Sequence, residues 1–291
     1  MPAPTPALAT PTDDPQALLA ASDSARARSA PREGAALARA AAQLAEARGD
    51  DALAAQAEAL LALHLVRLGD LESAVASGQQ ALARFAPQGP TAALSRAHST
   101  MSLAYERAGL HTLAVSQAAA ALAMAREVGD LCAECWALIR LGTAADESED
   151  QHGLELLGQA KELAQQLPEA EGEALFSALN NLSRRWVVEA DRRVGDANAA
   201  RDALMAALPL AEEAARRAQP GFAAATAAAN LGGIHRRLRH GLEARQHFQQ
   251  ALADAEQRGY AGLAGTVRLA LASLDVETET STAHQQALAR L

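Results

Sequence analysis

Two cysteines and eight histidines are the residues of this chain whose types could support nucleophilic or metal chemistry. Cys132 and Cys135 lie three residues apart, so on a helix their sulfurs share one face, as a dithiol requires. A zinc site needs two more ligands, and the sequence holds neither a second Cys-x-x-Cys nor a nearby histidine pair. We therefore expect both cysteines to pack as small apolar residues, without a disulfide framework, as in a reducing cytoplasm.

The histidines are scattered along the chain, and none belongs to a His-Glu-x-x-His motif. His240 and His247 are seven residues apart and so share a helix face, but two ligands do not complete a metal site. The glycine patterns that bind phosphates or position a nucleophilic serine do not occur either. The sequence therefore predicts a protein that is not an enzyme and has no metal and no cofactor.

The composition narrows the class of partner. The chain has 291 residues, a net charge of −9 and only 3% aromatic residues. An acidic protein repels phosphate backbones and anionic lipids, which disfavours nucleic acid and membrane surfaces as partners. No apolar stretch is long enough to span a bilayer, and the Pro- and Thr-rich residues 1–13 read as a disordered tail rather than a signal peptide. We expect a cytoplasmic protein.

The elements that would position any site come from a repeated pattern of alanines. Pairs of alanine separated by seven residues recur inside Ala-rich segments: Ala74 and Ala81, Ala114 and Ala121, Ala244 and Ala251. Glycine- and proline-containing turns follow one another at intervals of about forty residues, which is the period of a stacked helical array. Since a helix pair cannot bury its apolar face alone, each pair must pack on the next.

Proline at helix starts and glycine after helix ends define the expected helices. These helices cover residues 14–29, 31–48, 51–68, 71–86, 91–108, 110–128, 131–147, 152–166, 170–194, 196–218, 221–239, 241–258 and 261–275. Residues 281–291 are expected to begin another second helix. The sequence thus predicts one helical repeat domain over residues 14–291, with about six helix pairs, a partial one and no strands.

The repeated segments resemble the tetratricopeptide repeat, a family whose motif contains a Leu-Gly pair, an aromatic residue and alanines at fixed spacing. The best copy reads Leu231, Gly232, His235, Ala244, Phe248 and Ala251, with His in place of the usual Tyr. Two copies depart from the motif: Leu154 stands where alanine is expected, and about five residues are inserted after Trp186. The resemblance covers about residues 35–291 and implies an all-α fold, an α-α superhelix of antiparallel pairs.

In this family the first helix of each pair lines a concave groove that holds peptides or partner helices. The resemblance places eight polar residues there: Arg96, Thr100, Arg107, Arg140, Asn181, Arg184, Asn230 and Arg237. Asparagine amides can bond a peptide backbone in both directions, and the arginines would make the groove locally basic.

The expected function is a non-catalytic scaffold that binds an acidic or C-terminal segment of a protein or peptide partner. One alternative is the sensory or dimerising region of a bacterial signalling protein of the diguanylate cyclase type, in which the array could form a homodimer. Another is a peptide-responsive regulator.

Overall fold

The computed structural model describes residues 13–145, 150–168, 172–193 and 195–288. These residues form thirteen α-helices and one short 3-10 helix, Ala86–Gln88, and none of them lies in a strand. The predicted all-α class is confirmed. The chain groups into two compact units that divide between Val128 and Gly129. The expected tail lies outside the described residues apart from Asp13, and a single repeat domain over 14–291 stays a prediction.

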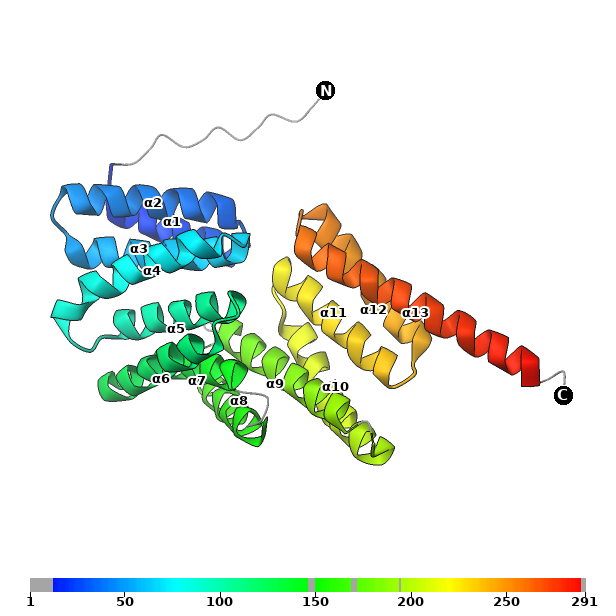
Figure 1. Cartoon of the computed structure of the whole chain (residues 1–291). Coiled ribbons are helices and arrows are strands. Elements are labelled where there is room, and N and C mark those ends of the chain that lie inside the picture. Colours follow the sequence, from blue (N-terminus) through cyan, green and yellow to red (C-terminus); the bar gives the residue numbers. More distant parts are fainter. Residues whose placement is uncertain (1–12, 146–149, 169–171, 194, 289–291) are drawn as a thin grey trace, which may run out of the picture. The chain divides into compact units, whose positions relative to one another are not determined.

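Unit 1 contains three helix pairs. Its helices are α1 (Pro15–Ala27), α2 (Pro31–Ala47), α3 (Asp51–Leu68), α4 (Leu71–Phe85), α5 (Ala92–Arg107) and α6 (His111–Val128). The two helices of a pair run antiparallel (Figure 1). The first helices of successive pairs also touch, because α1 contacts α3 and α3 contacts α5. They form a continuous row within the unit.

Unit 2 contains three further pairs and a final single helix. Its helices are α7 (Leu131–Ala144), α8 (Asp150–Ala164), α9 (Gly172–Arg192), α10 (Ala197–Arg217), α11 (Phe222–Arg237), α12 (Gly241–Gln257) and α13 (Ala261–Leu288). The first helices again form a row in which α7 contacts α9, α9 contacts α11 and α11 contacts α13. The longer fifth pair is confirmed, since α9 and α10 each span 21 residues.

Glycine-aspartate pairs end one helix and begin the next at three junctions: Gly49-Asp50, Gly69-Asp70 and Gly129-Asp130. The glycines have φ angles of 70°, 82° and 68°, in the left-handed region that residues with a Cβ rarely adopt. The three aspartates accept the backbone N–H three residues ahead at 3.0, 3.2 and 2.8 Å. Each therefore satisfies a donor that the first helical turn leaves unpaired.

Small residues allow the closest contacts between paired helices. All six alanines of the repeated pattern are 0% exposed: Ala74, Ala81, Ala114, Ala121, Ala244 and Ala251. A Cβ added to Gly232 would lie only 2.6 Å from Cδ1 of Phe248, so α11 and α12 approach at this glycine more closely than any side chain would permit. The predicted spacing of buried small residues is confirmed.

The fourth repeat is more regular than the sequence suggested. The assignment of Leu154 to the small-residue position is wrong, because the buried small residue of α8 is Gly153 and Ala160 follows it seven residues later. A Cβ on Gly153 would lie 3.0 Å from Nε of Arg185 on α9. Glycine therefore provides the room for the next helix, one position before the expected place.

The end of the chain also differs from the expectation. Residues 281–288 continue α13, which runs without interruption from Ala261 to Leu288, rather than starting a second helix. Residues 276–281 contain neither glycine nor proline, so nothing in their backbone chemistry stops the helix. No described helix is both long enough and apolar enough to cross a membrane.

Candidate functional site

Three of the eight predicted groove residues lie on α5 in unit 1. Arg96 and Arg107 are exposed, and Thr100 is half-buried. The Oγ1 of Thr100 donates a hydrogen bond to the carbonyl of Arg96 at 3.1 Å, one turn earlier. The threonine hydroxyl is therefore used within its own helix, while the two arginine side chains extend into solvent.

The other five residues lie in unit 2, on the row formed by α7, α9 and α11. Arg140 on α7 is half-buried, and its Cζ lies 5.6 Å from the ring centroid of Trp136. This distance permits a cation–π interaction. A guanidinium held against an indole face keeps its positive charge and the N–H donors at its edge.

The two asparagines use their amide N–H groups inside the fold. Nδ2 of Asn181 donates to the carbonyl of Ser177 at 2.9 Å, within α9. Nδ2 of Asn230 reaches from α11 to α9, where it donates to Oγ of Ser183 at 2.7 Å and to Oδ1 of Asn180 at 3.4 Å. Because Asn180 and Ser183 are buried, Asn230 connects two first helices in a site where water competes little.

Of the two remaining arginines, Arg184 on α9 is exposed and Arg237 on α11 is paired. Nε and Nη2 of Arg237 bind the two carboxylate oxygens of Asp191 on α9 at 2.7 and 2.6 Å, and Nη1 donates to the carbonyl of Gly233 at 3.3 Å. A bidentate pair is the strongest form of guanidinium–carboxylate contact. The row is thus less basic than its arginines alone predict.

An open cavity of about 440 Å³ adjoins Arg237 in unit 2. Residues of α9, α10, α11 and α13 line it, and its charged residues are Asp191, Arg236, Arg237, Arg239 and Glu277. Asp191 is already bound by Arg237, so among the described lining residues Arg236 and Arg239 face one further carboxylate, that of Glu277. A cavity with this surplus of guanidinium donors suits a carboxylate or another anion.

Three histidines come together where α11 meets α12. The Nδ1 atoms of His235 and His240 are 3.3 Å apart, and the His235 and His247 rings stack with centroids 5.3 Å apart. Burial, and then the neighbouring His247 and His240, lower the pKa of His235, which favours the neutral ring. Within the described ranges, no three His, Cys, Asp or Glu side chains are arranged to hold a metal ion.

In the described part of the chain, neither Cys132 nor Cys135 forms a disulfide. Cys135 on α7 is buried, and its Sγ donates to the carbonyl of Ala160 on α8 at 3.4 Å. Burial, with smaller contributions from Cys132 and Glu134, raises the pKa of the Cys135 thiol to about 12. The thiol is protonated at neutral pH and packs as the sequence predicts. Ser95 donates to Ala121 in the same way, at 2.8 Å between α5 and α6.

No protein-family model matches the sequence, and no curated protein matches it. Solved structures do match. NprR in complex with its cognate peptide NprX is 14% identical, with a TM-score of 0.62 over 95% of this chain and 76% of that one. A Rap protein complexed with Competence and Sporulation Factor is 11% identical, with a TM-score of 0.60 over 89% of this chain and 74% of that one. The apo form of RapI is 12% identical, with a TM-score of 0.55 over 91% and 99%.

These neighbours are tetratricopeptide-like repeat proteins. The chain therefore has a tetratricopeptide-like fold. This fold agrees with the helix pairing, the buried alanines and the row of first helices in each unit. All eight predicted groove residues lie on first helices.

Arg236 and Arg239 were not among the residues predicted from the sequence to line the groove. They flank Arg237 in the segment His235–His240, which contains three arginines, and this local basic run was a usable signal. The repeat register did not select them because it follows one face of each first helix, and neither Arg236 nor Arg239 occupies a register position on that face. Arg239 lies beyond α11, in the turn before α12, with a left-handed φ of 65°.

Proposed function

We propose that this chain is a non-catalytic scaffold that binds a peptide or protein segment along its first helices. The observation that carries the proposal is the arginine-lined cavity of unit 2, which Arg236, Arg237 and Arg239 supply with guanidinium groups. We propose that it takes an acidic side chain or a C-terminal carboxylate of the partner. Arg140 and Arg184, on the same row of first helices, would bind the remainder of the segment.

Two further observations support a binding role. The structures of similar fold include NprR bound to a peptide and Rap bound to Competence and Sporulation Factor, which favours a peptide-responsive regulator among the alternatives. The Cys135 thiol, whose pKa burial raises to about 12, is a poor nucleophile. We also propose a cytoplasmic location, because the two cysteines form no disulfide in the described residues, as expected in a reducing compartment. A sensory or dimerising region of the diguanylate cyclase type receives no support from these neighbours.

The test is a selection on the full chain from a random dodecapeptide library displayed with free C-termini. We expect the enriched peptides to carry Asp, Glu or a required free carboxylate. A synthetic peptide from the enriched pool should lose about tenfold or more in affinity for the R236Q/R239N variant, because charge-assisted hydrogen bonds are removed. Asparagine is chosen at position 239 because it tolerates the left-handed backbone there.

The matched control is R216Q. Arg216 lies on α10, pairs with Glu213 at 2.6 Å and is not part of the cavity. Its removal should leave the peptide affinity unchanged. The proposal is overturned if no peptide is enriched, or if the cavity variant and the control bind the peptide equally well.

A further inference from the structure

One face of α13 exposes large apolar side chains to solvent. Leu269 and Val276 are 71% and 62% exposed. With Gly265 and Ala272 they recur at intervals of four, three and four residues, the spacing of a helix face that packs against another helix. A Cβ added to Gly265 would meet no described atom within 4 Å, so this face is open. These four residues, Gly265, Leu269, Ala272 and Val276, are called the α13 seam below.

The same face of α11 is covered by its second helix. Forty residues before the seam, Ala225, Ala229 and Gly232 hold the equivalent positions. Ala229 packs against the apolar cluster that contains Phe248 of α12, and the Phe248 ring fills the space that a Cβ of Gly232 would need. The seam is therefore the face on which a first helix of this fold receives another helix. In the described part of the chain, no second helix follows α13 to cover it.

The charges beside the seam fit a second copy of α13 that runs antiparallel. Arg268 and Asp275 directly precede Leu269 and Val276, so both lie along the same flank of the seam. A two-fold axis brings this flank of one copy against the same flank of the other. Arg268 of each copy would then face Asp275 of the other copy. In a parallel pair Arg268 would instead face the opposite flank, where Ser273 carries no charge.

The sizes of the seam residues fit the same arrangement. With the two-fold axis between Ala270 and Leu271, Leu269 faces Ala272 of the other copy. Val276 then faces Gly265, where the space is open. Each large side chain meets a small residue, as Phe248 meets Gly232 between α12 and α11. The pairing would remove the exposed surface of Leu269 and Val276 from water in both copies, which favours association.

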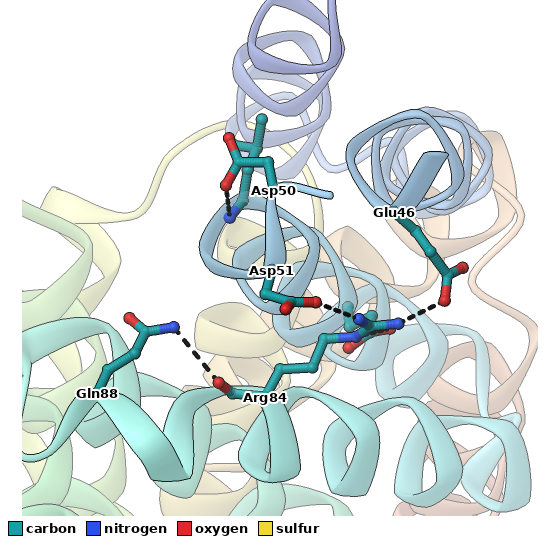
Figure 2. Close-up of polar contacts among 7 residues, drawn as sticks. Glu46, Asp50, Asp51, Arg84 and Gln88 are labelled. Carbon is teal, nitrogen blue, oxygen red and sulfur yellow. Dashed lines mark hydrogen bonds and ion pairs between the residues drawn. The ribbon is translucent and has the colours of Figure 1, made fainter. Parts of the chain in front are cut away.

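The ion pair that Arg268 already forms is compatible with a further contact. Arg268 binds Glu256 of α12 at 2.5 Å, and its side chain is 60% exposed. A guanidinium has five N–H donors, so it can bind several carboxylates at once. Figure 2 shows this in unit 1, where Arg84 binds Glu46 and Asp51, each at 2.7 Å. A third carboxylate binds the same guanidinium at 3.1 Å.

We infer that the α13 seam binds a second copy of this chain. The result is a two-fold dimer in which α13 of each copy takes the place of a second helix on the other. Leu269 and Val276 provide the apolar contact, and two symmetric pairs of Arg268 with Asp275 set the antiparallel orientation. The dimer is separate from the proposed peptide binding, because no seam residue is among the described residues that line the arginine-rich cavity.

Sedimentation equilibrium of the full chain at several concentrations tests the dimer. We expect the wild type to reach twice the monomer mass, and L269R to dimerise about a hundredfold more weakly because it places a charge at the centre of the seam. Since Leu269 is exposed, circular dichroism should show an unchanged helix content. The matched control is M205R, because Met205 of α10 is also exposed, at 49%, and lies outside the seam. This variant should dimerise as the wild type does.

A charge exchange tests the orientation. R268D and D275R each place like charges opposite one another at both symmetric contacts, so each should weaken the dimer about tenfold. The double variant R268D/D275R should recover wild-type association. Within one chain the exchange does not restore the pairs with Glu256 and Arg245, so recovery can come only from contact between copies.

A wild-type chain that stays monomeric, or a dimer that L269R leaves intact, would overturn the inference. So would a double variant that associates no better than R268D and D275R alone. Each of these results would leave the peptide-binding proposal standing, since that proposal depends on Arg236 and Arg239.

Discussion

His64 on α3 shows how one buried residue couples the fold to pH. It is 0% exposed, and its Nε2 lies 3.1 Å from Oγ of Ser22. Ser22 donates its hydroxyl hydrogen to the carbonyl of Gly34 at 2.9 Å, so its Oγ accepts a hydrogen bond from the Nε2–H of a neutral His64 ring. Nδ1 of His64 is buried without a partner, and burial lowers the pKa of this histidine to about 4.

This depressed pKa predicts a loss of stability in mild acid. In the unfolded chain His64 is protonated below about pH 6.5, whereas in the folded chain it is protonated only below about pH 4. Above pH 6.5 this pKa difference does not lower the free energy of unfolding. As the pH falls from 6.5 to 4, it lowers that free energy progressively. Between pH 7 and pH 4.5, the free energy of unfolding of the wild type should fall by about 2–3 kcal/mol more than that of H64Q. Urea unfolding of both proteins at the two pH values measures this difference. Equal losses in the two proteins would contradict this account.

At the scale of the helix, two adjacent glycines of α11 distinguish the effect of close packing from the effect of helix propensity. A Cβ on Gly232 would lie 2.6–2.9 Å from the Phe248 ring, whereas a Cβ on Gly233 would meet only Nη1 of Arg237 at 3.7 Å. G232A should therefore lower the free energy of unfolding by about 1–3 kcal/mol through overpacking. G233A should raise it by up to about 1 kcal/mol, because alanine favours the helix. Thermal unfolding followed by circular dichroism checks both, and similar shifts would refute the close contact.

At the scale of the whole molecule, the two units offer separate probes of stability. Trp136 and Trp186 are the only tryptophans and both lie in unit 2, so their fluorescence reports that unit alone. A Cβ on Gly34 in unit 1 would lie 2.2 Å from Cε1 of His64, so G34A should destabilise unit 1. In stacked arrays each repeat contacts only its neighbours. We expect G34A to shift the ellipticity transition in urea more than the fluorescence transition.

The reciprocal control is G232A in unit 2, which should shift the fluorescence transition directly. If G34A moves both transitions by the same amount, the two units unfold as one cooperative body and the expected independence is wrong.

Much of the architecture followed from local spacing. The boundaries of twelve helices lie within a few residues of their predicted places, because glycine, proline and aspartate act on the one or two turns beside them. One error was in the register of α8, where the buried small residue is Gly153. The other was at α13, where no glycine or proline ends the helix and it continues to Leu288. The candidate site was predicted less well. The eight predicted groove residues do lie on first helices, but the side-chain partners of Asn230 and Arg237 were not foreseen.

Alanines and glycines at regular intervals were sufficient to indicate stacked helix pairs, because close packing depends on the size of a residue and its position along the helix. The charge of each surface depended instead on residues far apart in the chain. Arg237 is neutralised by Asp191, 46 residues away, and Asn230 is bound by Ser183, 47 residues away. No local pattern encodes these pairings, since they form only when successive repeats stack. The basic cavity of unit 2 is a consequence of that stacking.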